Sequence, residues 1–304
     1  MDVKNAFPNG DLQEEVYMQQ PPGYPHSGSQ VCRLRHTFYG LKQAPRAWFE
    51  KFSLVVAQHG FTSSPHDTAL FVRRSSIGIT FILLYVDDMI ITRDDSAGIR
   101  SLQHFLSQHF EMKDLGTLSY FLGLKVTSSS DGYYLSQAKY ASNLLSKADI
   151  IDNKTISTPL EYNAKLMPLD DEPILDATHY HQLVGSLIYL TITRPDISHV
   201  MSMVSKFMDA LCSVHYVVVI RILRYVNGTL YYGLHYSSRP SLKLHAYSNA
   251  DWVGDSSDQC SIIGFCFMLG TSLVSWCSEK QDVVSRSNTE VEYRDLVNTT
   301  CKLV

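Results

Sequence analysis

The sequence has few of the features that mark secreted, zinc-binding or membrane proteins. It contains six cysteines in 304 residues, and no two of them form a CxxC pair. Reduced, buried thiols are therefore expected, rather than a disulfide framework or a zinc site. No apolar run reaches the roughly 20 residues that a membrane span needs. The run from Ile77 to Thr92 is interrupted by Asp87 and Asp88, so no membrane partner is expected.

The chain also lacks an excess of positive charge. Its formal net charge is −4, whereas nucleic-acid-binding domains are commonly basic. Any contact with a polynucleotide must then come from local basic patches or from parts of a longer protein. Apolar residues make up 45% of the chain and charged residues 18%, which is typical of a globular protein and excludes a disordered one.

The patterns that are present alternate between strand and helix around a central hairpin, which favours an α+β fold. Residues 46–59 carry apolar side chains at helical spacing and end before Gly60, so they predict a helix. Residues 78–85 and 89–92 are apolar and rich in β-branched side chains. They predict two strands joined by the turn Val86-Asp87-Asp88.

Weaker patterns extend this description to the rest of the chain. A polar segment with three prolines at 151–173 is interpreted as a linker. Before it, we expect helices at 96–110 and 139–148 and strands at 119–126 and 133–135. After it, we expect helices at 179–191, 195–208, 213–226 and 285–299, and strands at 242–247, 262–269 and 272–276. The predicted domains are residues 1–150, 151–238 and 239–304.

The adjacent aspartates Asp87 and Asp88, at the tip of an apolar hairpin, are the first candidates for chemistry. Carboxylates avoid burial unless they are paired or bind a metal. A strand carrying Asp2 beside the hairpin would bring Asp2 close to Asp87, and such hard oxygen ligands favour Mg²⁺. Two ions could then clamp the attacking and leaving oxygens of a phosphoryl transfer. An acidic surface turn beside a solvated terminus is the alternative that spacing alone leaves open.

An ordered series of motifs resembles the reverse transcriptase of copia-type LTR retrotransposons over essentially the whole chain. The motif Tyr85-Val86-Asp87-Asp88 would be a weak signal alone, but the full series is specific. Its other members are Asp2 to Leu12, Tyr39 to Trp48, Phe121 to Val126, Leu135-Ser136-Gln137, Val184 to Leu190, Arg194 to Ile197, Leu223-Arg224-Tyr225 and Gly228-Thr229-Leu230.

The resemblance implies an RNA-directed DNA polymerase with a palm that carries a β-hairpin active site. A helical thumb or connection and an incomplete ribonuclease H-like α/β unit would follow. Asp2 and Asp87 would be catalytic carboxylates that ligate two Mg²⁺ ions, with Asp88 in a supporting role. The partners implied are an RNA or DNA template with its primer, and deoxynucleoside triphosphates. The primer 3′-hydroxyl would attack the α-phosphorus.

The resemblance also implies roles around the nucleotide. Phe7 matches the aromatic residue that excludes a 2′-hydroxyl. Tyr39 and Gly40 would back the nucleotide and template, since a glycine lets the backbone approach closely. Lys42 or Arg46 could meet phosphate. A core phenylalanine and a basic, solvated helix start are the alternatives.

Two further stretches match family regions. Residues 121–126 resemble the primer grip, with an ordinary core strand as the alternative. The sequence from residue 246 to 293 contains segments that resemble a ribonuclease H domain, in which Glu290 matches the catalytic glutamate. Asn249 stands where the first catalytic aspartate is expected. A neutral amide binds Mg²⁺ far less well than a carboxylate, so ribonuclease H activity is predicted to be lost.

The fingers and integrase regions of the parent polyprotein are expected to lie outside this sequence. A second hypothesis is therefore a catalytically inactive, nucleic-acid-binding remnant of an integrated element. A third is a nucleic-acid-binding module that needs no metal. The resemblance implies an intracellular location, in a cytoplasmic particle or the nucleus.

Overall fold

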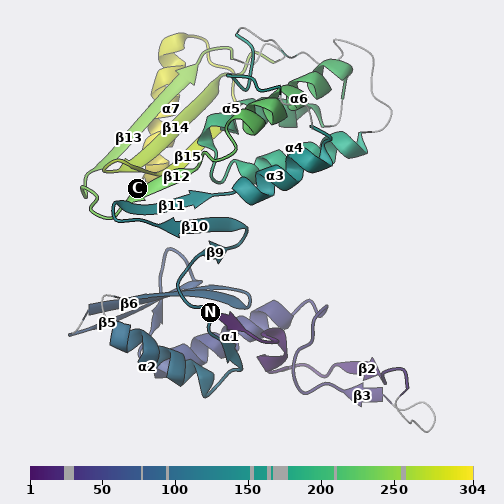
Figure 1. Ribbon diagram of the computed structural model, residues 1–304, viewed down its shortest axis with the longest axis vertical. Helices are drawn as coiled ribbons and strands as arrows, with labels where there is room; N and C mark the ends of the chain where they lie inside the picture. Colours follow the sequence, from purple (N-terminus) through teal and green to yellow (C-terminus); the bar gives the residue numbers. More distant parts are fainter. Residues whose placement is uncertain are drawn as a thin grey trace. The chain divides into compact units, whose positions relative to one another are not determined.

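The computed structural model describes residues 1–23, 31–76, 78–93, 96–150, 154–162, 166, 177–208, 211–254 and 258–303. They form a mixed α/β structure that divides into two compact units, Met1–Leu118 and Ser119–Val304 (Figure 1). The expected linker at 151–173 lies mostly outside the described residues, and the expected three-domain division stays a prediction. No helix among the described residues is long and apolar enough to cross a membrane.

The first unit is built on a six-stranded antiparallel sheet. In spatial order its strands are β4 (Thr62–Ser63), β5 (Leu70–Ser75), β6 (Gly78–Tyr85), β7 (Asp88–Arg93), β1 (Asp2–Val3) and β8 (Met112–Lys113). The predicted β6–β7 hairpin is confirmed, except that Asp88 begins the second strand. Strands β4 and β5, the 3₁₀ turn η1 (Phe7–Asn9) and the hairpin of β2 (Tyr17–Gln19) and β3 (Val31–Arg33) were not predicted.

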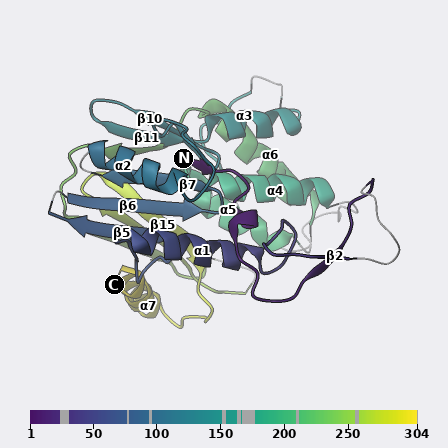
Figure 2. The same ribbon diagram turned by 90° about the horizontal axis from the view of Figure 1, so that it is seen from below.

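Helices α1 (Ala44–Gln58) and α2 (Ser96–Ser107) pack on one face of this sheet (Figures 1 and 2). The shared core contains Trp48 and Phe52 from α1, Leu102 and Leu106 from α2, and Val3, Ile82, Leu84 and Met89 from the strands. Side chains alternate across a strand. Because Val3 and Met89 point into this core, their neighbours Asp2 and Asp88 point to the opposite face of the sheet.

The second unit begins with a four-stranded antiparallel sheet. Its order is β12 (Leu234–Ser237), β11 (Gly132–Ser136), β10 (Leu124–Ser128) and β9 (Tyr120–Phe121). The expectation of one strand at 119–126 was wrong. Leu122 and Gly123 have φ values of 47° and 80°, and this left-handed pair turns the chain back on itself.

Four helices form the largest core of the second unit: α3 (Ala138–Lys147), α4 (Thr178–Leu190), α5 (Ser198–Val204) and α6 (Ser213–Gly228). The helix expected at 195–208 is divided, with 3₁₀ turns at Pro195–Ile197 and Ser205–Phe207 on either side of α5. Arg194, just before the first of these turns, is only 2% exposed and binds both Asp196 and Thr229.

A three-stranded antiparallel sheet and one helix complete the chain. The strands are β13 (Leu244–Asp251), β14 (Ile262–Leu269) and β15 (Ser272–Lys280), and the helix is α7 (Asn288–Leu303). The limits predicted for β14 are confirmed, whereas β13 continues past the predicted end at Tyr247. Val291 of α7 packs against Ala250 and Ile263 on one face of the sheet, and α5 lies against the other face through β15.

Candidate active site

The acidic hairpin ends in a two-residue turn, Val86-Asp87, between the paired residues Tyr85 and Asp88. Val86 has a φ of 55°, whereas the φ of Asp87 is not positive. A positive φ at the first turn residue alone is the pattern of a type II′ turn, which usually places glycine there. A β-branched residue in this conformation is uncommon and strained, so the surroundings must hold the turn in place.

Trp48 of helix α1 provides that support. Its indole Nε1 donates a hydrogen bond to the carbonyl oxygen of Val86 over 2.6 Å. The ring itself is only 2% exposed, and it lies 5.6 Å from the ring of Phe52 and 5.1 Å from that of Phe110. The main helix of the unit thus fixes the turn that precedes Asp87. The helical spacing of this segment predicted the helix, but it carried no signal for this bond.

Strand β1 brings Asp2 to the same hairpin. Asp2 lies directly opposite Asp88 in the β1–β7 pairing, and the Val3 amide donates to the carbonyl oxygen of Asp87 over 2.8 Å. Residues directly opposite in an antiparallel pair share a face, with Cβ atoms about 5 Å apart. We expected Asp2 beside Asp87. The structure gives it Asp88 as its direct partner, and Asp87 lies one residue earlier, in the turn before β7.

The three carboxyl groups interact through their charges. Burial raises the pKa of Asp88 above its ordinary value, and the negative charges of Asp87 and Asp2 raise it further, while the terminal amino group acts in the opposite direction. That amino group donates to the carbonyl oxygen of Met89 over 2.9 Å. The cluster therefore holds an excess of negative charge that a cation would relieve.

The carboxylates of this cluster fit a magnesium ion that is also held by water and substrate phosphates. They fit less well an ion that is held by protein side chains alone. Among the residues that the structure describes, no group of three or more His, Cys, Asp or Glu side chains is arranged to hold a metal ion. Mg²⁺ commonly takes one or two carboxylates and completes its octahedron with water and substrate phosphates. Asp2 and Asp88 lie opposite each other on adjacent strands and Asp87 lies in the turn between β6 and β7, so the cluster offers three carboxylates for such an ion.

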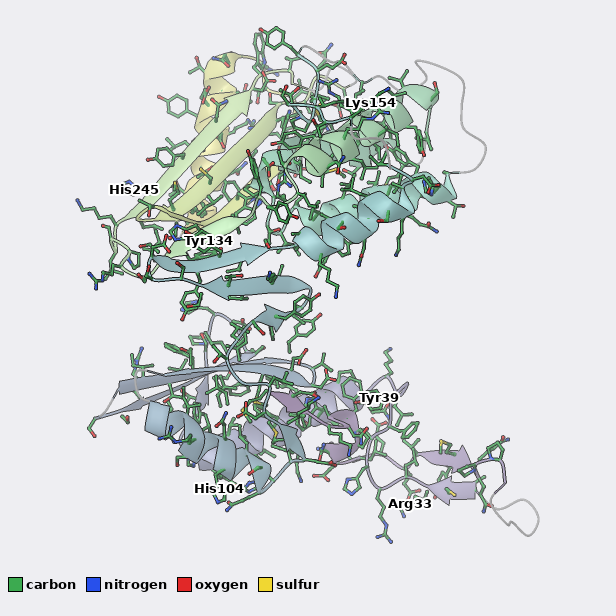
Figure 3. The ribbon with its side chains drawn as sticks, in the orientation of Figure 1. Arg33, Tyr39, His104, Tyr134, Lys154 and His245 are labelled. Atoms are coloured by element: carbon green, nitrogen blue, oxygen red, sulfur yellow. The ribbon has the colours of Figure 1, made fainter. Side chains whose placement is uncertain are left out.

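Two of the expected nucleotide-binding residues lie together. The rings of Phe7 and Tyr39 are 4.8 Å apart at an interplanar angle of 45°, and Tyr39 is 45% exposed (Figure 3). The Thr37 hydroxyl donates to the carbonyl oxygen of Phe7, a contact that the sequence did not suggest. Gly40 has a φ of 94° and open space where a Cβ would be, so its backbone conformation, and not crowding, calls for glycine.

The two expected phosphate ligands lie at the start of α1 and are exposed. Lys42 precedes the helix. Arg46 Nε donates to Glu50 Oε1 over 2.9 Å, one turn further along. An exposed pair of this kind contributes at most about 0.5 kcal/mol, so a phosphate can replace Glu50 as the partner of Arg46 at little cost.

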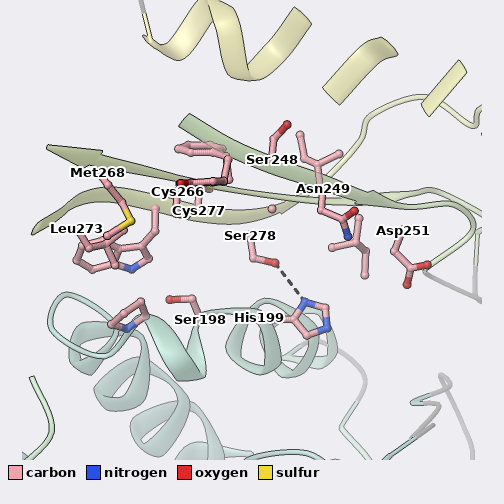
Figure 4. A pocket seen from close by; sticks show the side chains of 17 residues that line it. Ser198, His199, Ser248, Asn249, Asp251, Cys266, Met268, Leu273, Cys277 and Ser278 are labelled. Atoms are coloured by element: carbon pink, nitrogen blue, oxygen red, sulfur yellow. Dashed lines mark hydrogen bonds between the residues drawn. The ribbon is translucent and has the colours of Figure 1, made fainter. Parts of the chain in front are cut away.

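The structure does not bring Asn249 and Glu290 together. Asn249 on β13 lines a cavity of about 630 Å³ with His199, Asp251 and Ser278, where His199 Nδ1 lies 3.3 Å from Ser278 Oγ (Figure 4). Its neighbour Ala250 packs toward α7, so alternation turns Asn249 to the other face of the sheet.

Glu290 lies at the start of α7 and is held by local partners. It accepts hydrogen bonds from the Arg286 amide over 2.9 Å and from Arg294 Nη2 over 2.8 Å. The amide of Arg286, followed by the side chain of Arg294, lowers the pKa of Glu290 below its usual range. These hydrogen bonds stabilise the ionised form of Glu290, and both of its carboxylate oxygens already have a donor.

Known proteins resemble the chain along its whole length. The sequence profile of the reverse transcriptase (RNA-dependent DNA polymerase) family matches residues 1–162. The retrovirus-related Pol polyprotein from transposon RE1 of Arabidopsis thaliana is 42% identical over 100% of this chain, which spans 21% of that polyprotein. The corresponding polyprotein from transposon TNT 1-94 of Nicotiana tabacum is 38% identical over 96% of the chain, which spans 23% of it.

A shorter relative is matched from end to end. The putative transposon Ty5-1 protein of Saccharomyces cerevisiae is 33% identical over 96% of this chain and 97% of its own length. The family match and these alignments agree with the family that the motif series indicated. The chain therefore belongs to the reverse transcriptase (RNA-dependent DNA polymerase) family, among the copia-type, retrovirus-related Pol polyproteins of transposons.

Proposed function

We propose that the first unit contains a reverse transcriptase palm that transfers deoxynucleotides to a primer 3′-hydroxyl on an RNA or DNA template. Asp2 and Asp87 are the proposed magnesium ligands, and Asp88 supports them. One observation carries the proposal: strand β1 pairs with β7 so that Asp2 lies opposite Asp88, beside the turn that holds Asp87. Asp2 and Asp88 lie on the face of the sheet opposite to the one on which α1 and α2 pack.

The chain's own contribution to such a reaction is positioning. When bound, two Mg²⁺ ions would neutralise the charge on the transferred phosphoryl group and on the leaving pyrophosphate. Asp2 holds its carboxylate on strand β1, and Asp87 holds its own in the turn that precedes the adjoining strand β7. The bond from Trp48 to Val86 keeps the turn from moving. Preorganisation of this kind matters because a misplacement of about 1 Å can lower a rate about 100-fold.

The contact between Phe7 and Tyr39 supplies a candidate wall for the sugar of the incoming nucleotide. Phe7 is proposed to exclude a 2′-hydroxyl, since a rigid ring leaves no room for an added oxygen. Tyr39 and Gly40 are proposed to back the nucleotide, and Lys42 and Arg46 to bind its phosphates. Arg46 would exchange Glu50 for a phosphate, which accepts two parallel hydrogen bonds from a guanidinium group.

The remaining elements fit supporting roles in the same proposal. The β9–β10 hairpin is proposed as the primer grip, residues 151–238 as the connection, and residues 239–304 as a ribonuclease H-like domain without cleavage activity. The Asn249 amide and the separation of Asn249 from Glu290 support the loss of that activity. Degradation of an RNA–DNA hybrid with Mg²⁺, abolished by Glu290→Gln, would overturn it.

Primer extension tests the polymerase proposal directly. The full chain is incubated with a primed RNA template, deoxynucleoside triphosphates and Mg²⁺. Extension is expected for the wild type, and a loss of about 100-fold or more for Asp2→Asn and Asp87→Asn. Asp67→Asn is the matched control, because Asp67 Oδ1 accepts a hydrogen bond from the Ala69 amide, and the side-chain oxygen of asparagine can accept the same bond.

The outcome separates the polymerase from the inactive remnant. Extension that Asp87→Asn removes and Asp67→Asn retains supports the proposal. Template binding without extension, equal in the wild type and in Asp87→Asn, contradicts it and supports a nucleic-acid-binding remnant. Circular dichroism melting curves for each variant show whether a lost activity reflects a lost fold.

A further inference from the structure

The cavity of about 630 Å³ that Asn249 lines lies between helix α5 and the three-stranded sheet of the second unit (Figure 4). We call it the α5 cavity. Asn249 and Gly264 are opposite each other in the strand pairing, and their neighbours Ala250 and Ile263 pack toward α7. Alternation therefore turns Asn249 and Gly264 to the other face, toward α5. Pockets that hold small molecules commonly measure about 300–1,000 Å³, so the α5 cavity has room for one.

Gly264 forms the floor of the α5 cavity. It lies between Asn249 of β13 and Ser278 of β15 in the strand pairing. A Cβ built on Gly264 would be 3.8 Å from the carbonyl oxygen of Cys277, and no other atom of the described residues comes as near. The missing side chain therefore leaves a strip of backbone on which a planar ring can lie.

Two aromatic side chains border this floor. Tyr247 and Trp276 both line the cavity, and each is opposite Cys266 in the strand pairing, one on either side. Tyr247 is 58% exposed, so its ring is open to a ligand. Aromatic rings favour the flat face of another ring, and nucleobases stack on them readily.

The polar side chains gather at one end of the α5 cavity. Asn249, Asp251 and His199 lie toward that end, and Met268 and Leu273 lie toward the other (Figure 4). Asn249 and Asp251 are two residues apart on β13, so they share a face of the strand. Within the part of the chain that the structure describes, neither side chain makes a hydrogen bond, and both are exposed. Two hydrogen-bonding groups are thus available side by side.

The wall formed by α5 holds a polar atom without a partner. Ser198 lines the α5 cavity, and its Oγ is buried without a hydrogen bond to any described residue. Native structures rarely leave a buried hydroxyl in this state, because it has lost its hydrogen bonds to water. A ligand with polar atoms would supply the missing partner.

The hydrogen-bonding pattern at the polar end selects the class of ligand. An ionised Asp251 accepts hydrogen bonds through two oxygens, whereas the Asn249 amide both donates and accepts. A matching ligand needs two adjacent N–H donors for Asp251 and an acceptor beside them for Asn249. Among the common nucleobases, guanine alone has adjacent donors, at N1 and N2. It also carries acceptors at O6 and N7.

We propose that the α5 cavity binds the base of a guanine nucleoside. The base lies over Gly264, donates from N1 and N2 to Asp251, and accepts at O6 from the Asn249 amide. N7 remains as an acceptor for the Ser198 hydroxyl. An asparagine at 249 is a poor magnesium ligand, and here its amide recognises the base. This inference goes beyond the proposed polymerase, and its ligand site belongs to the second unit alone.

Equilibrium dialysis of the full chain against tritiated guanosine tests the proposal. EDTA is present, so that no metal-dependent binding contributes. One saturable site per chain is expected. Inosine lacks the 2-amino group and is expected to compete about 10-fold less well, the loss typical of one hydrogen bond to a charged group. Adenosine, with neither donor in place, should compete more weakly still.

Two competition results would overturn the assignment of guanine. The first is adenosine that competes as well as guanosine. The second is free arginine that competes as well as guanosine, because a guanidinium group also offers a carboxylate two adjacent donors. The absence of saturable guanosine binding by the wild type would overturn the proposal altogether.

Substitutions at the polar end locate the binding. Asp251→Asn removes the charged acceptor, and Asn249→Asp replaces the amide donor by a carboxylate that repels O6. Each is expected to weaken guanosine binding about 10-fold or more. Asp282→Asn is the matched control, because Asp282 is also exposed but lines a different cavity beside α7. Equal affinities for Asp251→Asn and Asp282→Asn would contradict the proposed site.

Gly264→Val tests the floor without removing a polar group. Valine is favoured in strands, and its Cβ has room at this position, but the added methyl groups occupy the place of the base. Guanosine binding is expected to be lost while the fold is retained. Circular dichroism melting curves show whether each variant is folded. A folded Gly264→Val chain that binds guanosine like the wild type would overturn the inference.

The present inference and the polymerase proposal fail in different ways. Guanosine binding that depends on Asp251, in a chain that extends no primer, overturns the polymerase proposal alone. Primer extension that depends on Asp87, in a chain that binds no guanosine in EDTA, overturns the present inference alone.

Discussion

The indole nitrogen of Trp48 lies 2.6 Å from the carbonyl oxygen of Val86, and this one hydrogen bond connects helix α1 to the acidic turn. Val86 holds a φ of 55°, which a β-branched residue adopts only when its surroundings impose it. The place of Asp87 therefore depends on a buried donor in a different element of the unit.

Replacing Trp48 by phenylalanine removes that donor and leaves a small cavity. Trp48→Phe is expected to destabilise the fold by about 1–3 kcal/mol and to slow primer extension about 10- to 100-fold, because Asp87 is less well placed. Phe52→Leu is the control, since Phe52 is also fully buried in this core and does not bond the turn. Equal rate losses in two equally stable variants would show that the indole has no positioning role.

Asp88→Asn is expected to leave the fold as stable as the wild type, or to stabilise it by on the order of 0.5 kcal/mol, when no divalent cation is present. The substitution removes one of three mutually repelling carboxyl groups, and solvent screening keeps the gain small. Urea denaturation in EDTA measures it. A clear loss of stability would mean that the Asp88 charge has a structural partner and is not merely repelled by Asp2 and Asp87.

Gly123→Ala is expected to destabilise the second unit by about 2 kcal/mol or more. Gly123 has a φ of 80°, and a Cβ there would clash with the hydroxyl of Tyr189, which itself donates to the carbonyl oxygen of Leu122. Adding Tyr189→Phe to Gly123→Ala should recover part of the loss, although Tyr189→Phe alone costs about 1 kcal/mol. A double-mutant cycle tests this coupling, and purely additive losses would contradict it.

Arg194→Lys is expected to cost about 2–3 kcal/mol. Arg194 is 2% exposed, and its Nε and Nη2 donate to the two oxygens of Asp196 over 2.9 and 2.6 Å. Lysine keeps the charge but cannot make both bonds. Arg46→Lys, which affects only the exposed pair with Glu50, should change stability by less than about 0.5 kcal/mol. Urea denaturation measures the free energy of unfolding of both variants, and the two values can be compared if the slopes are similar. Equal losses of stability would contradict the prediction.

The ion pair of Arg194 and Asp196 also predicts that the stability of the fold depends on pH. Burial acts to raise the pKa of Asp196, but the hydrogen bond and charge of Arg194, together with the Tyr225 hydroxyl, outweigh it and hold the pKa below its ordinary value. A depressed pKa stabilises the fold fully above the unfolded value of about 3.9 and loses that contribution as pH falls through the folded value.

The stability difference between the wild type and Asp196→Asn should therefore be largest near neutral pH and shrink below about pH 4. Urea denaturation across a series of acidic buffers measures it. A difference that stays constant from neutral pH to pH 3 would show that the Asp196 carboxylate gains nothing from Arg194 when it is ionised.

The pattern of residues within a segment was sufficient to predict those helices and strands whose signal is local. The β6–β7 hairpin and strand β14 follow from runs of β-branched and aromatic residues, and α1 follows from its apolar spacing. The break between β9 and β10 could not be predicted, because Leu122 takes a left-handed conformation that leucine seldom adopts. Strand β12 was missed because its partner β11 lies far earlier in the chain, and local sequence carries little signal for such a pairing.

The candidate site was likewise predictable from the sequence only in part. The motif series led us to expect Asp2 beside the acidic turn, and strand β1 does reach it. The register could not be predicted, because a slip of one residue turns every side chain of a strand to the other face. The direct partner of Asp2 is thus a structural result.

Strand β12 completes a sheet whose other three strands all come before residue 137. A fragment ending at residue 162, where the family match ends, would lose both β12 and the Tyr189 that holds the Leu122 turn. The bare edge of β11 would then be open to strands of other molecules, which is a route to aggregation. The family match at residues 1–162 therefore ends inside the second compact unit, and a fragment of this chain prepared for study should retain the sequence through Ser237.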